Sequence, residues 1–104
     1  MVTLLVVQLD ALNEEGQCLL EFKRNLHDQF GKLKTWMSTD ENPCNWEGVQ
    51  CINSTGDPKV WSLDLSGMHL IGSLSPAISN LTSLRVLNVS SNILSGKIPP
   101  NIGD

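Results

Sequence analysis

The sequence predicts an α/β repeat fold, in which parallel strands stack into a solenoid behind an N-terminal helical cap. Apolar residues recur at a constant 24-residue offset in the second half of the chain, which is typical of stacked repeats. The first half differs in composition, because residues 1–59 carry 14 of the 18 charged side chains and two of the three tryptophans. The chain therefore has two parts, a cap and a repeat region.

The repeat region, residues 60–104, contains two copies of one apolar pattern. Side chains alternate between the two faces of a strand, so Leu87 and Val89 point inward and their neighbours point outward. We expect parallel strands over 60–65 and 84–89. The residues related by the offset are Leu63 and Leu87, Leu65 and Val89, Leu70 and Leu94, Gly72 and Gly96, Leu74 and Ile98, and Ile78 and Ile102.

A polar residue, Asn92, occupies the turn after the second strand. Its amide can donate to and accept from backbone groups that lie outside a regular ladder. The first repeat has Met68 at the equivalent position. Gly96 allows the next bend, and Pro99 keeps the following segment extended. We expect structural roles for these residues.

The cap begins with a predicted amphipathic helix over 13–26. Asn13 is a suitable N-cap, and the two glutamates after it complement the helix dipole. Leu19 and Phe22 belong to an apolar stripe with a spacing of three to four residues, which must be buried against another element. We expect this stripe to cover the first strand of the repeat region. The tryptophans at positions 36 and 46 are expected to pack inside the cap.

Three cysteines constrain the cap. Cys44 and Cys51 are separated by six residues, whereas Cys18 lies within the helical pattern. One disulfide between Cys44 and Cys51, with Cys18 free, is the simplest interpretation. Zinc binding is the competing one, but a tetrahedral site needs four ligands, and only Cys18, His27 and His69 remain, none at zinc-finger spacing. We therefore expect no metal and no other cofactor.

Length, charge and hydropathy exclude several classes of protein. The 104 residues suffice for one small domain, which excludes a multidomain enzyme. The net charge is −4 and lysines and arginines are not clustered, so nucleic acid is not an expected partner. The longest apolar stretch, residues 2–9, is far shorter than the roughly 20 residues of a transmembrane helix. We interpret residues 1–11 as a partial signal peptide and exclude them from the fold.

Particular residues of both parts carry a family resemblance. The cap has LLEFK at 19–23, then Trp36, then PCNWEGVQC at 43–51. The second repeat, 81–99, fits the pattern L-x-x-L-x-x-L-x-L-x-x-N-x-L-x-G-x-I-P at every fixed position except Val89. Cap and repeats resemble those of plant leucine-rich-repeat receptor-like kinases and receptor-like proteins. The resemblance implies a leucine-rich-repeat solenoid, with a disulfide-bonded cap over 12–59 and two plant-type repeats over 60–104.

Two features depart from the family pattern. Cys18 stands where such caps usually have a small apolar residue, and the membrane span and kinase domain of the family are absent from these 104 residues. No kinase signature is present, neither a Gly-rich phosphate loop nor a catalytic-loop aspartate. The resemblance therefore implies no enzymatic activity for this chain.

What the resemblance implies is an extracellular interaction module, the N-terminal part of a receptor-like kinase ectodomain that recognises ligands or co-receptors. The implied location is secreted or on the outer side of the plasma membrane. The implied partners are a protein or peptide ligand, a co-receptor ectodomain and further repeats of the parent protein. The alternative is a stand-alone small secreted leucine-rich-repeat protein, such as an inhibitor of microbial enzymes.

The candidate binding face follows from strand alternation, because solenoids bind partners on an exposed strand surface. Trp61 precedes this surface, and it either packs on the cap or offers an aromatic anchor to a ligand. The outward positions are Ser62, Asp64, Ser66, Val86, Asn88 and Ser90.

Three asparagines, Asn53, Asn80 and Asn88, begin N-glycosylation sequons. Asn53 follows the Cys51 loop and Asn80 precedes the second strand, so we expect both to be exposed. Asn88 lies on the strand face and is the less favoured site. A secreted chain is expected to be a glycoprotein.

Overall fold

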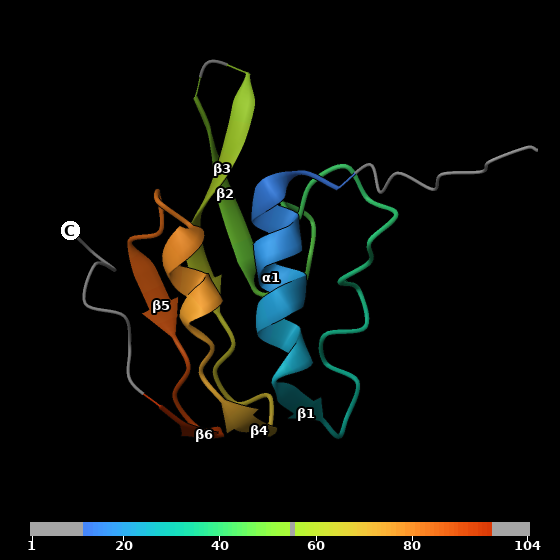
Figure 1. Cartoon of the computed structure of the whole chain (residues 1–104), viewed down its shortest axis with the longest axis vertical. Coiled ribbons are helices and arrows are strands. Elements are labelled where there is room, and N and C mark those ends of the chain that lie inside the picture. The colour runs from blue at the N-terminus through green and yellow to red at the C-terminus, as the bar shows by residue number, and fades with distance from the viewer. Residues whose placement is uncertain (1–11, 55, 97–104) are drawn as a thin grey trace, which may run out of the picture.

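The computed structural model describes residues 12–54 and 56–96, and these residues form two three-stranded sheets, one helix and one 3₁₀ helix (Figure 1). The sheet orders are β2-β3-β5 and β1-β4-β6. The predicted signal remnant, 1–11, and the apolar positions Ile98 and Ile102 lie outside the described residues. The elements in chain order are α1 (Glu14–Arg24), β1 (Leu26–Asp28), β2 (Val49–Ser54), β3 (Asp57–Asp64), β4 (Leu70–Ser73), η1 (Pro76–Asn80), β5 (Val86–Asn88) and β6 (Ile93–Ser95).

Each repeat supplies one strand to each sheet. β3 and β5 pair in parallel with Leu63 opposite Leu87, which is the 24-residue offset of the sequence. β4 and β6 also pair in parallel, with Gly72 opposite Leu94. The predicted parallel solenoid is thus confirmed. The cap closes both sheets on one side with antiparallel strands, β2 against β3 and β1 against β4.

The helix begins as predicted and ends earlier. Asn13 Oδ1 accepts the backbone N–H of Gly16 at 2.9 Å, which is an N-cap. The prediction that the helix reaches residue 26 is wrong, because α1 ends at Arg24 and the next residues form β1. β1 lies against β4 beside Gly72, whose φ is +143° and where a Cβ would collide with the carbonyl oxygen of Asn25. Pairing with β4 therefore replaces the last turn of the helix.

The core is continuous from the cap into the repeats. Leu19 and Phe22 of α1 are fully buried in the same cluster as Leu63 and Leu70. α1 packs mainly against η1, whereas we expected it to cover the first strand. Its link to β3 is a buried hydrogen bond from the Val60 N–H to Oε1 of Glu15, at 2.7 Å. The other core residues are Leu12, Leu33, Trp36, Trp46, Val49, Val60, Leu65, Met68, Leu74, Ile78, Leu81 and Leu84.

The cap has an aromatic and covalent centre of its own. Trp36 and Trp46 stack with ring centroids 5.3 Å apart, and each is 3% exposed, which confirms that they pack inside the cap. A disulfide joins Cys44 and Cys51, as the sequence predicts, and Cys18 is a free, half-buried thiol. Closing a loop of this length stabilises the fold by about 2.5 kcal/mol in the chain-entropy treatment.

The Asn92 side chain forms hydrogen bonds with backbone groups where the chain passes from one sheet to the other. Its Oδ1 accepts the N–H of Leu70 at 2.9 Å, and its Nδ2 lies 2.8 Å from the carbonyl oxygen of Leu65, in the preceding repeat. Nδ2 also donates to Val89 and Ser90. The predicted structural role of Asn92 is confirmed, and its side chain joins the two repeats.

The burial of Phe22 gives a first prediction. Phe22→Ala should lower the free energy of unfolding by about 3–5 kcal/mol, because the ring is fully buried and its removal leaves a cavity. Phe30, which is 60% exposed, is the matched control, and Phe30→Ala should change stability by no more than about 0.5 kcal/mol. Urea denaturation measures both. Equal effects of the two substitutions would contradict the assignment of Phe22 to the core.

The contacts of Asn92 give a second prediction. Asn92→Ala should lower the free energy of unfolding by about 1–3 kcal/mol, because the Leu70 N–H and the Leu65 C=O, which belong to fully buried residues, lose their partner. Asn45, which is exposed, is the control, and Asn45→Ala should shift stability by less than about 0.5 kcal/mol. A thermal melt in which the Asn92 variant matches the parent chain would show that water replaces the amide at no cost.

Candidate binding surface

The outer side of the β2-β3-β5 sheet is the candidate binding surface, and we call it the sheet face. Its register places Ser62 opposite Val86 and Asp64 opposite Asn88. Leu63 and Leu65 point the other way, into the core. The residues of the sheet face are Gln50, Ser62, Asp64, Ser66, Val86, Asn88 and Ser90.

A depression of about 420 Å³ lies on the sheet face where the cap meets the first repeat. Two carboxylates, Glu47 and Asp64, are on its lining, and no lysine or arginine is among the lining residues. Its charge therefore favours a cationic group. The lining residues are Glu47, Gly48, Val49, Gln50, Ser62, Asp64, Ser66 and Met68.

The same local hydrogen bonds occur in both repeats on this face. Asp64 Oδ1 accepts the Ser66 hydroxyl at 2.7 Å and the Ser66 N–H at 3.0 Å. Asn88 Oδ1 accepts the Ser90 hydroxyl at 2.8 Å and the Ser90 N–H at 3.1 Å. The bond from the Ser66 hydroxyl, followed by that from its N–H, lowers the pKa of the exposed Asp64 carboxyl. Asp64 therefore keeps its negative charge down to lower pH than an ordinary aspartate.

The predicted outward positions differ in exposure. Val86 is 42% exposed, whereas Ser62 is only 7% exposed, because β2 and β5 flank this short side chain on both sides. Ser62 lies on the lining of the depression, but neighbouring groups cover most of its side chain. Trp61 is half-buried. The pairing of β2 with β3 changes register at this point, because Gln50 lies opposite Ser62 whereas the next residue, Cys51, lies opposite Val60. Trp61 is not among the residues that line the depression.

Two polar residues on the lining of the depression, Glu47 and Gln50, come from the cap and were not found from the sequence. Glu47 precedes β2, and Gln50 lies on β2 opposite Ser62. The alternation of Val49, Gln50 and Cys51 is a weak strand signal that could have indicated the outward position of Gln50. Nothing local in the sequence indicates that this strand pairs with β3.

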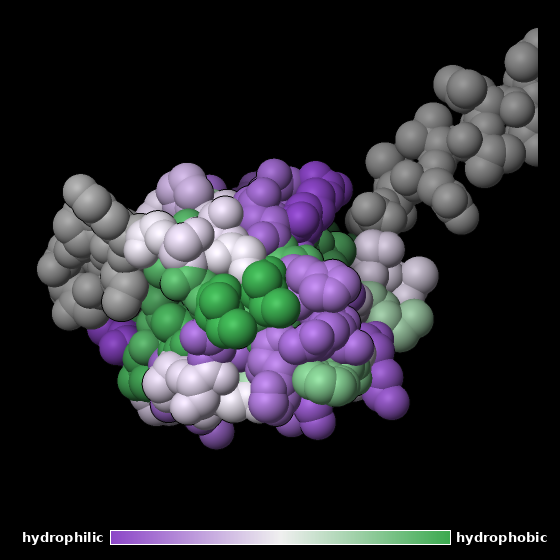
Figure 2. Space-filling model, turned by 90° about the horizontal axis from the view of Figure 1, so that it is seen from below, coloured by the Kyte–Doolittle hydropathy of each residue, from purple (hydrophilic) through white to green (hydrophobic). Residues whose placement is uncertain are grey.

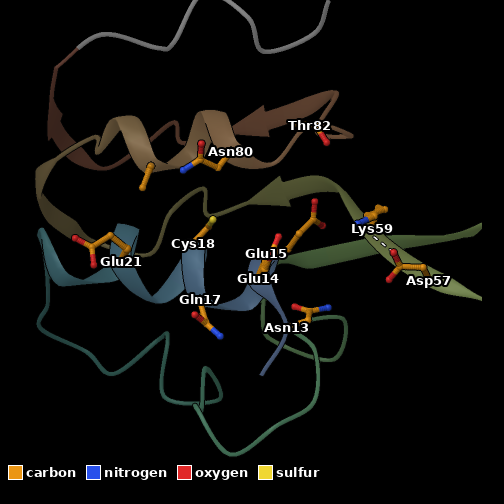
Figure 3. Close-up of a pocket in the computed structure, with 11 residues that line it drawn as sticks. Asn13, Glu14, Glu15, Gln17, Cys18, Glu21, Asp57, Lys59, Asn80 and Thr82 are labelled. Carbon is orange, nitrogen blue, oxygen red and sulfur yellow. Dashed lines mark ion pairs between the residues drawn. The ribbon is translucent and has the colours of Figure 1, made fainter. Parts of the chain in front are cut away.

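A second hollow, the α1–η1 groove, lies between the helix and the 3₁₀ helix and has a volume of about 760 Å³ (Figure 3). Most of its charged groups already have partners. Glu15 accepts the Val60 N–H, Glu21 pairs with Arg24, and Lys59 Nζ lies 3.2 Å from Asp57. The groove is therefore less available than the sheet face for a charged ligand.

Cys18 lies in the α1–η1 groove. Burial raises the pKa of its thiol, and the nearby glutamates raise it further, whereas the Asn80 side chain, within hydrogen-bonding reach, opposes the rise. A thiol with a raised pKa is a weak nucleophile at neutral pH, because the thiolate is the reactive form. Within residues 12–54 and 56–96, no three groups of the metal-binding kinds gather into a site.

The β1-β4-β6 sheet forms a different surface on the lower side of the molecule, where apolar residues gather (Figure 2). β4 and β6 expose Ile71 and Ile93, which lie opposite each other in the register. Among the described residues, no helix is long and apolar enough to cross a bilayer. The two sheets thus present surfaces of contrasting polarity.

The fold and the sheet face define a repeat protein with an N-terminal cap, and comparison with known families agrees. Residues 12–52 match the leucine rich repeat N-terminal domain, and residues 59–81 and 83–104 match the Leucine Rich Repeat. The chain therefore belongs to the leucine-rich-repeat proteins. It is 51% identical over 92 residues to a leucine-rich repeat receptor-like serine/threonine-protein kinase of Arabidopsis thaliana. The match covers 88% of this chain and 8% of that kinase.

Solved structures of plant receptor ectodomains share the fold. The BIR3–SERK2 complex from Arabidopsis thaliana aligns with a TM-score of 0.71 and 32% identity, over 83% of this chain and 47% of the other. The Arabidopsis receptor kinase HAESA ectodomain, in complex with an IDA peptide hormone, aligns with a TM-score of 0.67 and 33% identity. That alignment covers 81% of this chain and 13% of HAESA.

The hydrogen bonds of Asp64 give a third prediction. Ser66→Ala removes the hydroxyl donor, so the Asp64 pKa should rise toward the ordinary aspartate value. The bonds favour the ionised form in the folded state, so their contribution to stability is present above the unfolded pKa. It is lost as pH falls through the lowered pKa of the folded state. An NMR titration of the Asp64 carboxyl carbon measures the change.

Ser90→Ala is the control for this titration, because the Ser90 hydroxyl bonds Asn88 instead. It should leave the Asp64 pKa where it is. An Asp64 pKa that does not move in the Ser66 variant would show that the hydroxyl bond has no electrostatic effect.

Proposed function

We propose that this chain is an extracellular protein-interaction module, the N-terminal part of a plant receptor-like kinase ectodomain. Its sheet face would take part in recognising a peptide, a protein ligand or a co-receptor ectodomain. The observation that carries the proposal is one polar surface shared by cap and repeats, with a depression at their junction.

The chemistry of the sheet face supports binding of a ligand with a cationic group. Asp64 and Glu47 are both exposed and lie on the lining of one depression. Beside them, Gln50 and Ser66 offer hydrogen-bonding groups, and Val86 offers an exposed apolar contact. This combination of a charged pocket and an apolar neighbour suits a short extended peptide.

The disulfide supports an extracellular location, since such bonds persist in oxidising compartments. The related HAESA ectodomain binds a peptide hormone, and BIR3 forms a complex with SERK2. We infer a binding role rather than a catalytic one. The raised pKa of the Cys18 thiol is consistent with this, because it makes the free cysteine a poor nucleophile.

Further repeats are also proposed partners. Leu87 and Leu94 are half-buried, whereas Leu63 and Leu70, their equivalents in the first repeat, are fully buried. A repeat that packed against β5 and β6 would complete their burial, as each repeat of a solenoid does for its neighbour.

The proposal is tested by binding of two probes, the IDA peptide and the SERK2 ectodomain, in isothermal titration calorimetry. Asp64→Arg and Val86→Arg, which change charge and shape on the sheet face, should each weaken binding by tenfold or more, which is about 1.4 kcal/mol. Glu14→Arg alters charge at an exposed position on α1 and should leave the dissociation constant unchanged.

Two results would contradict this proposal. Loss of binding in the Glu14 variant, with binding retained in both sheet-face variants, would place the ligand at α1. Failure of the unmodified chain to bind either probe would remove the IDA peptide and the SERK2 ectodomain as ligands of these two repeats.

A further inference from the structure

The three sequons occupy different surroundings in the fold. Asn80, the last residue of η1, is exposed, and so is Thr82, while Leu81 between them is 3% exposed and anchors the segment in the core. Both polar residues of this sequon therefore face solvent from a fixed backbone. Asn80 and Thr82 also lie on the lining of the α1–η1 groove (Figure 3).

The groove beside Asn80 has room for a sugar. It is an open hollow of about 760 Å³, and its lining is polar, with Asn13, Gln17 and Glu21 on the α1 side. The Asn80 side chain lies within hydrogen-bonding reach of Cys18 on the same lining. A group attached to Asn80 Nδ2 would therefore lie over the groove and above the thiol.

We propose that Asn80 carries an N-linked oligosaccharide that covers the α1–η1 groove, that Asn53 carries a second one, and that the sheet face stays free of glycan. The proposal rests on the extracellular location proposed above, because the sugar is added in the secretory pathway. It goes beyond that location by assigning the modified residues and the side of the molecule that they cover.

The modification is a glycosyl transfer from a lipid-linked oligosaccharide pyrophosphate. The amide Nδ2 forms a bond to the anomeric carbon of the first sugar, and the bond from that carbon to the pyrophosphate oxygen breaks. Nδ2 loses one proton, and the lipid pyrophosphate leaves with the electron pair of the broken bond. The sequon hydroxyl, here that of Thr82, is required in the acceptor.

The second site, Asn53, lies in the β2–β3 hairpin, which projects beyond the rest of the molecule (Figure 1). Asn53 is exposed, and its register partner is Pro58. Its place in the projecting hairpin separates it from the depression at the junction of cap and repeats. A glycan there would leave that depression open.

Asn88 is in a different position. It is half-buried in β5, opposite Asp64, and its Oδ1 already accepts two hydrogen bonds from Ser90. A sugar on Asn88 would project from the sheet face beside Asp64 and cover the surface on which the ligand is proposed to bind. The structure therefore assigns the glycans to the other two sequons.

The test uses the chain with a secretion signal, produced in plant cells, and peptide mapping after glycosidase release in ¹⁸O-labelled water. Asn53 and Asn80 should carry the label and Asn88 should not. Thr82→Ala removes one sequon but keeps Asn80 and its contact with Cys18. This variant should lose the mass of one glycan. Ser90→Ala, the matched control, should lose none.

A second readout reports where the Asn80 glycan lies. Cys18 of the folded chain is alkylated with a maleimide, and the reaction should be several-fold slower in the glycosylated parent than in the Thr82→Ala variant. Ser90→Ala should react at the parent rate, because its sequon is on the opposite side of the sheet.

Each remaining result overturns a named part of the proposal. An unlabelled Asn80 or Asn53 in a chain with an intact Cys44–Cys51 disulfide refutes glycosylation at that residue but leaves the extracellular location standing. Equal alkylation rates refute the covering of the groove, and a labelled Asn88 refutes the free sheet face. A chain that passes through the secretory pathway but forms neither the Cys44–Cys51 disulfide nor a glycan counts against the oxidising, extracellular environment proposed for it. The ligand titrations test recognition separately.

Discussion

The structure depends on one constraint: backbone N–H and C=O groups at the bends of the solenoid need hydrogen-bond partners. The chain crosses twice per repeat between two sheets, and the backbone groups at each crossing lie outside the ladders, where an unpaired group is costly. Asn92 meets this need with one side chain that bonds Leu65 and Leu70 of the first repeat and Val89 and Ser90 of its own. It fixes the spacing of the repeats, and with it the register that aligns Leu63 with Leu87.

The first repeat has no repeat before it, so the cap meets the same constraint by other means. Met68 takes the place of the asparagine and is buried, since no backbone of an earlier repeat lies there to be bonded. The cap instead supplies the Glu15 carboxylate to the Val60 N–H and the Gly48 carbonyl to the Asp64 N–H. β1 and β2 then pair the remaining edges, which protects the open side of both sheets.

This junction also produces the features proposed for function. Because β2 must lie beside β3, Gln50 and Glu47 meet Asp64 and Ser66 and create a depression that neither cap nor repeat contains alone. The same packing places α1 and η1 on the core side of the sheet, so Asn80 and its sequon face away from the sheet face. The proposed binding surface and the Asn80 sequon thereby lie on opposite sides of the β2-β3-β5 sheet.

The sequence by itself determined the features that depend on local chemistry or on repetition. The 24-residue offset indicates which leucines share a row, Asn13 marks the start of the helix, and the spacing of Cys44 and Cys51 indicates their disulfide. The resemblance to plant leucine-rich-repeat caps adds the order of cap and repeats. Each of these can be predicted because it rests on residues close in the chain or equivalent by repeat.

Only the tertiary structure decided which distant segments pair. Leu26 continues the apolar spacing of the helix, yet it lies in β1, because hydrogen bonding with β4 outweighs one more helical turn. The burial of Ser62 and the position of Gln50 on the sheet face likewise follow from the pairing of β2 with β3. Such pairing is stabilised by contacts between residues that are distant in the sequence. No single stretch of sequence contains both partners, so local patterns do not predict it.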